Sequence, residues 1–558
     1  MKCLHTLVSL LFAAVAVLSG CNPGDIDNTM INRYQAEMAA RSPQPRRSDM
    51  GGGLLEPTGA LCPKLELTQE PNGTVVKMTL NEAVMRALAN NLDIRVISFD
   101  PEIAREDMIK AAAAFDVTVF GSYGINDQHT HPASTSTPEQ VHLQTAEAGV
   151  RQLVPTGGTW AISHSLQRSW DNGALSTLPL NYQNVMALEV TQPLLRDAWP
   201  EFNLAKLKIA QTTRKSSEAD FRNTLEQTIA KVVAQYWTLW QSRREVIIRQ
   251  ELLQTTIDTL HRMQARGEID AAAAQIKQAE AAVKDTQIQL ERAVKAVADS
   301  QDSLAQLLAD PQVNLVSNLE IVPISDPAQS PLSINVAEQL LTALEHNPQL
   351  ARARLAIELS EINVTIADNQ TLPRLDFKGR GSYQGLAGTY EPALHEMGDM
   401  SNFSFGASLS FEYPLGNRAA LADLARTKLE RLKAVSQMQN LADQIAQAVR
   451  ERSREIGRSY REIQLTRELI EAKKAELQAL MDLEEIRGRL TPEFLQLKLS
   501  TQNQLADAKS GELRAVQGYN TAVVGLAQVT GTILKTYSVD LALPSVMGES
   551  EWPKRNEK

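Results

Sequence analysis

The longest stretches without glycine or proline constrain this chain most. Neither residue occurs between Pro200 and Gly267, nor between Gly267 and Pro311. A helix rises 1.5 Å per residue, so the first stretch alone could extend over on the order of 100 Å. Charges such as Arg243 and Arg244 exclude a membrane-spanning helix. The spacing of the apolar residues predicts a coiled-coil seam: Phe221, Leu225, Ile229, Val232, Tyr236, Leu239, Val246, Leu253, Ile257 and Leu260.

The same plan occurs twice along the chain. At one constant offset, Leu80, Glu82, Ala87, Leu88, Asn91 and Ile94 match Val336, Glu338, Ala343, Leu344, Asn347 and Leu350. A second offset relates Val190, Pro193 and Leu194 to Phe411, Pro414 and Leu415, and carries Arg266-Gly267 onto Arg487-Gly488. In the second copy the long stretches run from Asn417 to Arg487, interrupted only by Gly457, and from Pro492 to about Leu534. Each copy is therefore predicted to fold as a helix, strands, a very long helix, a turn and a long helix.

Two-residue alternation marks the strands. From 401 to 413 the apolar positions are Phe403, Phe405, Ala407, Leu409, Phe411 and Tyr413, and mostly serines lie between them. Leu375, Phe377 and Tyr383 alternate with charged residues, and segments 117–123 and 186–190 give weaker versions. One apolar and one polar face is typical of a membrane barrel wall. A half-buried sheet of a soluble domain is the alternative.

These segments predict four principal strands per chain, too few to close a barrel. Open strand edges in lipid would leave backbone groups unpaired, so other copies must complete the sheet. Three copies would supply twelve strands, which predicts a homotrimer. A further hairpin, 147–154 and 160–166, has mixed outward residues in Arg151, His164 and Ser165. We therefore expect it to extend beyond the bilayer, although in the wall it would raise the count to six per chain.

The N-terminus has the features of a secretory signal. Met1-Lys2, an apolar run from Leu7 to Leu18 and the string LSGC precede Asn22. The run is too short to span a bilayer. LSGC resembles the lipobox of bacterial lipoproteins, which predicts acyl chains such as palmitate on Cys21; an ordinary cleaved signal is the alternative. Of the other cysteines Cys3 lies in the signal, which leaves only Cys62 and excludes an intrachain disulfide framework.

Several strings, in duplicate order, resemble the TolC-type outer-membrane efflux proteins: TQPLLR (191–196), EYPLG (412–416), the two Arg-Gly turns, LAQLL (304–308) and LAQVTGTIL (526–534). The resemblance covers roughly Thr79 to Leu534. It implies a mostly α-helical fold with a transmembrane β-barrel portion: a trimer whose twelve-stranded barrel continues as an α-helical barrel. It also implies a passive export duct in efflux or type I secretion, whose partners are a periplasmic adaptor (membrane fusion) protein and an inner-membrane transporter.

The resemblance assigns adaptor contact to the tips of the two helical hairpins. In this sequence they are Arg266, Gly267, Glu268 and Ile269, and Arg487, Gly488, Arg489, Leu490 and Thr491. Family members often close the tunnel with acids about six positions after the tip glycine, but Ala273 and Phe494 stand there. The nearest acids are Asp270 and Glu493. A conventional aspartate ring is therefore not expected, and Glu493 with Phe494 forms the alternative pore constriction.

Glycines in the last long helix predict close packing. Gly511, Gly518 and Gly525 are seven residues apart and so share one helix face. Each costs about 1 kcal/mol against alanine in a helix, so the stripe suggests near approach of a neighbour.

No catalytic, cofactor or metal site is indicated, so the chain is not expected to be an enzyme. The histidines are scattered, and His129 and His131 lie in a polar stretch that resembles an external loop. Neither a phosphate-binding glycine-rich loop nor a nucleophile elbow occurs, and the net charge of −10 forms no basic stripe for nucleic acid. A lipid-anchored structural periplasmic coiled coil is the alternative function; a lipid-anchored envelope enzyme is disfavoured.

The expected organisation has five parts. Residues 1–20 are the lipoprotein signal peptide and 21–66 a lipid-anchored tether rich in Pro, Gly and Ser. The first structural repeat is 67–325, the second is 326–535, and 536–558 is a C-terminal tail. The expected location is the outer membrane, with the chain extending into the periplasm.

Overall fold

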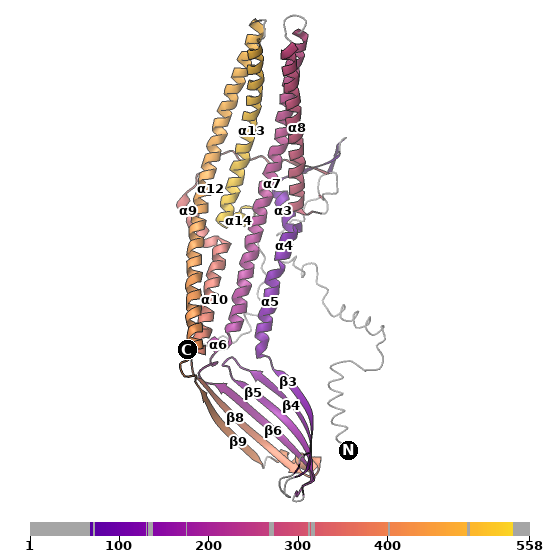
Figure 1. Ribbon diagram of the computed structural model, residues 1–558, viewed down its shortest axis with the longest axis vertical. Coiled ribbons are helices and arrows are strands. Elements are labelled where there is room, and N and C mark those ends of the chain that lie inside the picture. Colours follow the sequence, from indigo (N-terminus) through magenta and orange to yellow (C-terminus); the bar gives the residue numbers. More distant parts are fainter. Residues whose placement is uncertain are drawn as a thin grey trace, which may run out of the picture. The chain divides into compact units, whose positions relative to one another are not determined.

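The structure is a computed structural model. It describes residues 67–70, 73–129, 131, 138–173, 176–266, 273–310, 313, 319–399, 402–487 and 491–539, all within one compact unit, 60–539. Within this unit, long helices run side by side and lead at one end into a sheet (Figure 1).

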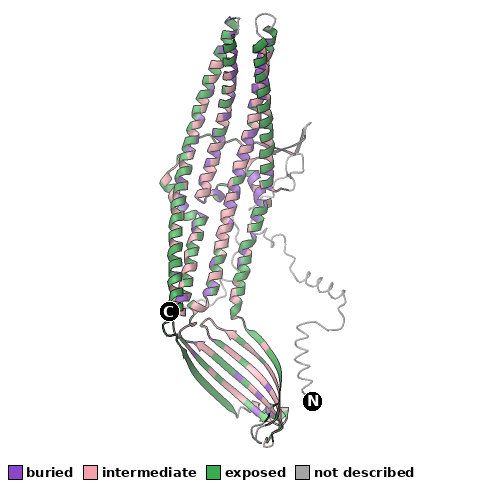
Figure 2. Ribbon diagram, in the orientation of Figure 1, coloured by how far each residue is buried: buried purple, intermediate pink, exposed green. Residues whose placement is uncertain are grey.

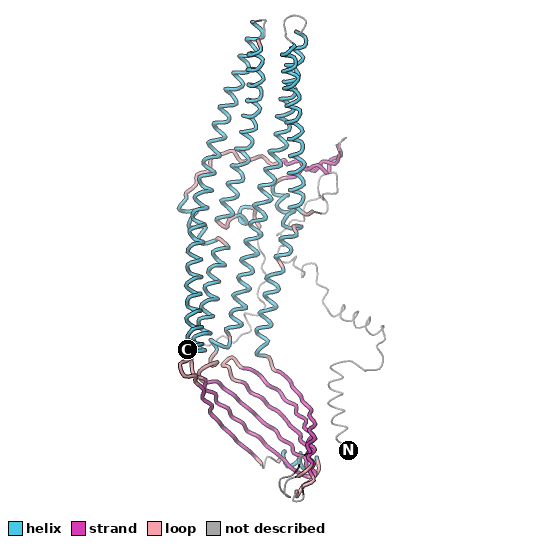
Figure 3. The backbone as a smooth tube through the Cα atoms, in the orientation of Figure 1, coloured by secondary structure: helices cyan, strands magenta, loops and turns pink. Residues whose placement is uncertain are grey.

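Two long helical hairpins dominate the unit. One pairs α7 (Ala205–Arg266) with α8 (Ala273–Leu308), and the other pairs α12 (Arg418–Arg487) with α13 (Pro492–Val529) (Figure 3). Pro492 occupies the first turn of α13, and the Thr491 hydroxyl caps it by accepting from the Phe494 N–H at 3.3 Å. The mostly helical fold with long hairpins predicted from the sequence is confirmed.

The predicted seam of α7 is buried in its first half and shifts in its second. All six residues from Phe221 to Leu239 are buried, whereas Val246, Leu253, Ile257 and Leu260 are half-buried. Ile248 and Leu252 are buried instead, against Ala506 of α13, and Met263 packs with Ala279, Leu495 and Leu499. The shift arises because here α7 packs against α13 of the other hairpin as well as against α8.

The glycine stripe of α13 faces α12 of the same chain. A Cβ at Gly511, Gly518 or Gly525 would lie 3.7, 3.7 or 3.3 Å from the nearest atoms of Thr466, Ser459 and Arg452. These partners are also seven residues apart. The absent side chains thus let α12 and α13 lie close together.

The duplication is visible at the shorter helices α3 (Leu80–Asn90), α4 (Leu92–Ile97), α9 (Val336–His346) and α10 (Pro348–Gln370). Asn91 caps α4 and donates to the Leu307 carbonyl of α8 at 2.7 Å. Its equivalent Asn347 caps α10 and donates to the Val529 carbonyl of α13 at 2.8 Å. The two asparagines therefore join the short helices to the long hairpins in the same way.

A small sheet fixes the middle of α7. Strand β2 (Gly73–Met78) pairs with β1 (Leu67–Glu70) and, in parallel, with β7 (Leu319–Pro323). The hydroxyl of the buried Tyr236 donates to the Met78 carbonyl and accepts from the Ser325 N–H, both at 3.0 Å. Burial raises the pKa of Tyr236, so the phenol stays a donor.

The large sheet has six antiparallel strands in the order β3-β4-β5-β6-β8-β9. Their bounds are Thr118–His129, Gln140–Leu153, Thr159–Asp171, Leu180–Pro193, Arg374–Ala387 and Phe403–Glu412. The expected count of four strands per chain is wrong: the described sheet has six, because the 147–166 hairpin belongs to it. That hairpin forms β4 and β5, which pair along their length inside the sheet.

Short helices complete the unit: α5 (Phe99–Ala112), η3 (Ala113–Phe115), α6 (Pro200–Asn203), α11 (Tyr390–Gly398) and α14 (Ile533–Thr536). Helix α5 leads into β3, α6 follows β6, and α11 lies between β8 and β9. The first strand of the sheet, β3, therefore follows α5, and the last strand, β9, leads into α12.

Candidate functional site

The register of the large sheet separates its two faces. One transverse row crosses all six strands with Val119, Val150, Ile162, Leu188, Gly381 and Phe405. The adjacent row is Thr118, Arg151, Ala161, Glu189, Arg380 and Gly406. Because side chains alternate along each strand, the first row lies on one face and the second on the other.

Most of the apolar face is exposed in the single chain, and α11 covers it beside Gly385. Val119, Phe405 and Phe411 expose 78, 71 and 68% of their surface. Burying apolar area is worth roughly 25 cal/mol per Å², so a broad patch of this kind normally contacts another apolar phase. The opposite face carries charges, including Lys378, Arg380 and an Arg374–Asp376 ion pair at 2.9 Å. One face suits lipid and the other suits water.

Both side edges of the chain are open. Strand β3 pairs only with β4, and β9 only with β8, among the described strands. Helix α5, which leads into β3, and α4 before it expose Leu92, Val96, Phe99 and Ile103. The first turns of α12, which follow β9, expose Leu421, Leu429 and Leu432. Figure 2 shows both helices as largely exposed beside the sheet.

The two edges carry opposite charge. Helix α5 has four acids, Asp100, Glu102, Glu106 and Asp107, against Arg105 and Lys110. Residues 418–433 of α12 have five basic side chains, Arg418, Arg426, Lys428, Arg431 and Lys433, against Asp423 and Glu430. The acidic edge of one copy is therefore complementary in charge to the basic edge of a second copy. Head-to-tail contacts of this kind generate rings when the rotation closes.

The predicted tip residues are described only in part. Arg266 and Arg487 end α7 and α12, while Gly267, Glu268, Ile269, Gly488, Arg489 and Leu490 lie outside the described residues, as do Asp270 and the lipidation candidate Cys21. Thr491 and Glu493 are exposed, and Phe494 is half-buried. Ala273, the first residue of α8, is exposed.

A buried ion pair near the second tip was not anticipated from the sequence. The Lys498 ammonium lies 2.5 Å from a Glu484 carboxylate oxygen, and both side chains are at least nine-tenths buried between α12 and α13. Pairing opposite charges at similar distances from the turn could have found it. On the same side of the tips, Arg262, Ala265, Gln478, Met481, Asp482 and Glu485 line a groove of about 450 Å³ between α7 and α12.

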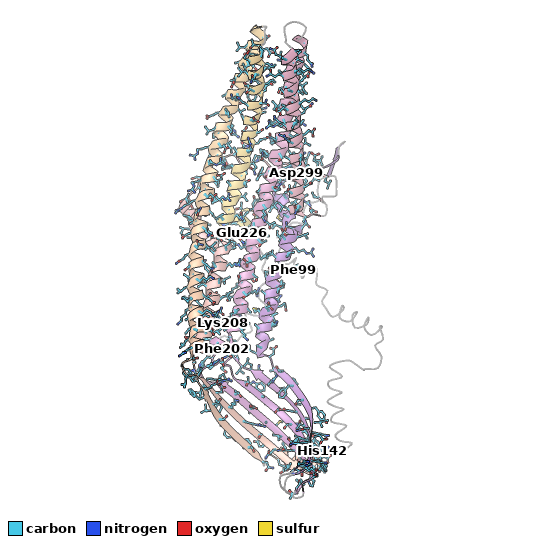
Figure 4. The ribbon with its side chains drawn as sticks, viewed as in Figure 1. Phe99, His142, Phe202, Lys208, Glu226 and Asp299 are labelled. Atoms are coloured by element: carbon cyan, nitrogen blue, oxygen red, sulfur yellow. The ribbon has the colours of Figure 1, made fainter. Side chains whose placement is uncertain are left out.

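A second unanticipated group is Glu226 on α7 (Figure 4). Its side chain is buried, and Arg222 donates to it at 2.9 Å while also donating to the Gly531 carbonyl at 2.9 Å. Burial raises the pKa of Glu226 to about 7, against the opposing effect of Arg222. In the sequence, its signal is a glutamate next to the seam residue Leu225.

Histidines gather at the end of the sheet far from the helices, where Figure 4 marks His142. Asp127 lies 2.5 Å from His142 Nδ1 and 3.7 Å from His129 Nε2, and His142 stacks obliquely against Trp170. His131 is exposed. Within the described part of the chain, no group of three or more metal-ligating side chains is arranged to hold an ion. None of the described helices is long and apolar enough to cross a membrane.

Comparison with known proteins assigns this architecture. Residues 340–486 match the family described as outer membrane efflux protein. The match spans 147 of the 558 residues. No curated protein sequence matches the chain.

Solved structures of outer-membrane channels share the fold of this chain. The channel OprN superposes with a TM-score of 0.62 at 17% identity, covering 81% of this chain and 90% of OprN. Campylobacter jejuni CmeC gives 0.58 at 15%, covering 83% and 90%. Neisseria gonorrhoeae MtrE in its open state gives 0.57 at 15%, covering 86% and 98%. The likeness extends over nearly the whole length of each channel.

Proposed function

We propose that the chain is the outer-membrane channel subunit of a tripartite efflux or type I secretion system. It is a passive export duct across the periplasm and the outer membrane. The observation that carries the proposal is the six-stranded sheet, with one largely exposed apolar face and one charged face, joined to long helical hairpins. A structural rod has no use for a lipid-facing sheet.

The duct is a homotrimer that takes strands from every copy. Each open edge strand in lipid would leave unpaired backbone groups at several kcal/mol apiece, so the edges of neighbouring copies pair. Complementary charge on α5 and α12 and their exposed apolar residues support this head-to-tail contact. The copy number of three follows from the family resemblance.

The hairpin tips, 266–269 and 487–491, contact a periplasmic adaptor that links the duct to an inner-membrane transporter. The groove between α7 and α12 supports this, because it lies beside the tips and combines Arg262 with the acids Asp482 and Glu485. The pore narrows at Glu493 and Phe494, on the first turn of α13. Replacing the exposed Thr491 by a photo-crosslinking residue is expected to trap the adaptor; capture only by a crosslinker at Lys277, on the exposed side of α8, would contradict the tip contact.

Cys21 carries the lipid and is the first mature residue, as the LSGC string supports. Acyl chains gain about 0.8 kcal/mol per buried methylene, so several of them hold the N-terminus at the membrane. Mass spectrometry of the mature N-terminus tests this. An unmodified Cys21, or a chain that starts elsewhere, would end the proposal.

Conductance of cysteine variants, each labelled on one face of the large sheet, tests whether the protein forms a duct. The purified full-length complex in a planar bilayer is expected to give discrete conducting steps. Labelling Lys378→Cys on the charged face with a bulky charged thiol reagent should reduce each step, while labelling the matched Leu409→Cys on the apolar face should not. Complexes of the expected mass without conducting steps, or an equal effect of both labels, would contradict the duct.

A further inference from the structure

The first repeat carries a β-hairpin that the second lacks, and we propose that this hairpin widens the membrane part of the duct. Three copies of a six-stranded sheet then close a barrel of eighteen strands, in place of the twelve expected from four strands per chain. This inference rests on the proposed trimer, and it concerns the wall that each copy contributes.

Continuous pairing shows that β4 and β5 are full members of the wall. Val141 to Leu153 of β4 pair residue by residue with Asp171 to Thr159 of β5. On its other side, β4 pairs with all of β3, and β5 pairs with β6 from Thr159 to Trp170. Separating the hairpin from the sheet would leave two long rows of backbone groups unpaired.

The hairpin also continues both faces of the wall. Register places Arg151 and Ser165 on the same face as Lys378 and Arg380, away from the apolar row. On the apolar face, the hairpin presents Val150, Ile162 and Leu166 beside Leu188 and Val119. Polar residues share this face: Arg168 donates to Gln144 at 3.5 Å, and the Nε2 atom of His164 is buried without a hydrogen-bond partner in the single chain. The residues that look mixed in sequence thus fall on opposite faces.

The turn of the hairpin is built into the junction between sheet and helices. Gly157 has φ +86°, and a Cβ on it would lie 2.4 Å from the Asp197 carbonyl oxygen. The Thr156 carbonyl accepts from the Trp199 N–H at 3.1 Å and from Gln192 Nε2 at 3.0 Å. At the start of β3, Gln152 donates to the Phe115 carbonyl at 2.8 Å. A free extension outside the wall would need none of these contacts.

The strand number fits closure. Strand β3 leaves the helical part after α5, and β9 returns to it before α12, so an even count makes β3 of one copy antiparallel to β9 of the next. Barrel diameter grows nearly linearly with strand number, so eighteen strands give a wall roughly 1.5-fold wider than twelve. Barrels of 16–18 strands enclose an aqueous channel. The membrane section would therefore admit solutes of larger cross-section than a twelve-stranded wall.

Cysteine accessibility tests whether the hairpin lies in the wall. In the full-length chain with Cys62→Ser, Ser163→Cys lies on the charged face and Ile162→Cys on the apolar face of β5. The complex is reconstituted in liposomes and treated with a membrane-impermeant maleimide. The water-facing thiol should react at least about tenfold faster, because lipid excludes the reagent and apolar surroundings disfavour the thiolate. Ser408→Cys and Leu409→Cys on β9 form the matched control pair.

Native mass spectrometry of the same preparations gives the copy number. Three copies, with unequal labelling in both cysteine pairs, is the expected result and gives eighteen strands. Three copies, with unequal labelling on β9 but equal labelling on β5, would place the hairpin outside the wall and overturn this inference while leaving the trimer intact. Two copies would overturn both the eighteen-stranded barrel and the proposed trimer. Equal labelling in both pairs would show that the sheet is not a membrane wall and would overturn both as well.

Discussion

Glu226→Gln should make the protein more stable at neutral pH, by an amount that depends on pH. Glu226 is 1% exposed, and burial raises its pKa from 4.5 to about 7. The folded state therefore holds a proton that the unfolded state releases. Stability from the protonated acid is complete below pH 4.5, falls as the pH rises to about 7, and is constant above that. Glutamine keeps the size and hydrogen-bonding capacity of the protonated acid but cannot ionise.

The size of the effect follows from the pKa. One pKa unit corresponds to 1.36 kcal/mol, so a rise from 4.5 to about 7 amounts to about 3 kcal/mol at most. That pKa already includes the opposing effect of Arg222, which keeps the Gly531 carbonyl as a partner in the variant. We expect a gain of about 1–3 kcal/mol at pH 8 and little difference at pH 4.5.

Thermal unfolding of the detergent-solubilised complex between pH 4.5 and pH 8 measures this difference. The midpoint of Glu226→Gln minus that of the unaltered protein should rise up to about pH 7 and then level off. Glu218→Gln is the matched control, because it removes another i,i+4 ion pair of α7, with Arg214 at 3.1 Å, at a more exposed position. Parallel pH profiles for Glu226→Gln and the unaltered protein would refute the argument.

Three further substitutions test the packing. Gly157→Ala should destabilise by about 1–3 kcal/mol, because φ is +86° and the new Cβ meets the Asp197 carbonyl; an unchanged unfolding midpoint would contradict the anchored turn. Lys498→Met should cost about 3–5 kcal/mol by leaving Glu484 buried and unpaired, and adding Glu484→Leu should recover part of the loss; no recovery would refute the pair. Gly518→Ala should be tolerated or stabilise by up to about 1 kcal/mol, since its Cβ would be 3.7 Å from α12, whereas Gly518→Leu should destabilise by about 1–3 kcal/mol; equal effects would exclude close packing there.

The helical part could be predicted because its signals are local. Stretches without glycine or proline gave the long helices, and Pro492 and Thr491 mark the start of α13. The late seam of α7 was misplaced because its burial depends on α13, more than two hundred residues away in the chain. The same dependence on distant partners hid the Lys498–Glu484 pair.

The strands could be predicted only in part, because the sequence does not give the register in which they pair. In β9 every second residue is hydrophobic, so the strand and its apolar face can be predicted from the sequence alone. In β5, His164 and Ser165 lie on opposite faces because side chains alternate, but only the register shows that Arg151 of β4 shares the face of Ser165. Without the register, these three residues give the hairpin a mixed pattern, so β4 and β5 could not be recognised as members of the sheet. The edges, and hence the assembly, could be inferred only once the strand order was known.

Removing the proposed anchor tests most directly whether this protein is an outer-membrane channel. A full-length chain with Cys21→Ser behind an ordinary cleavable signal has no lipid to hold it. This variant is expected to stay in the outer-membrane fraction after alkaline carbonate extraction, because the exposed apolar face of the sheet would lie in the bilayer. Release of the folded protein into the soluble periplasmic fraction would contradict the account and favour a lipid-anchored structural coiled coil.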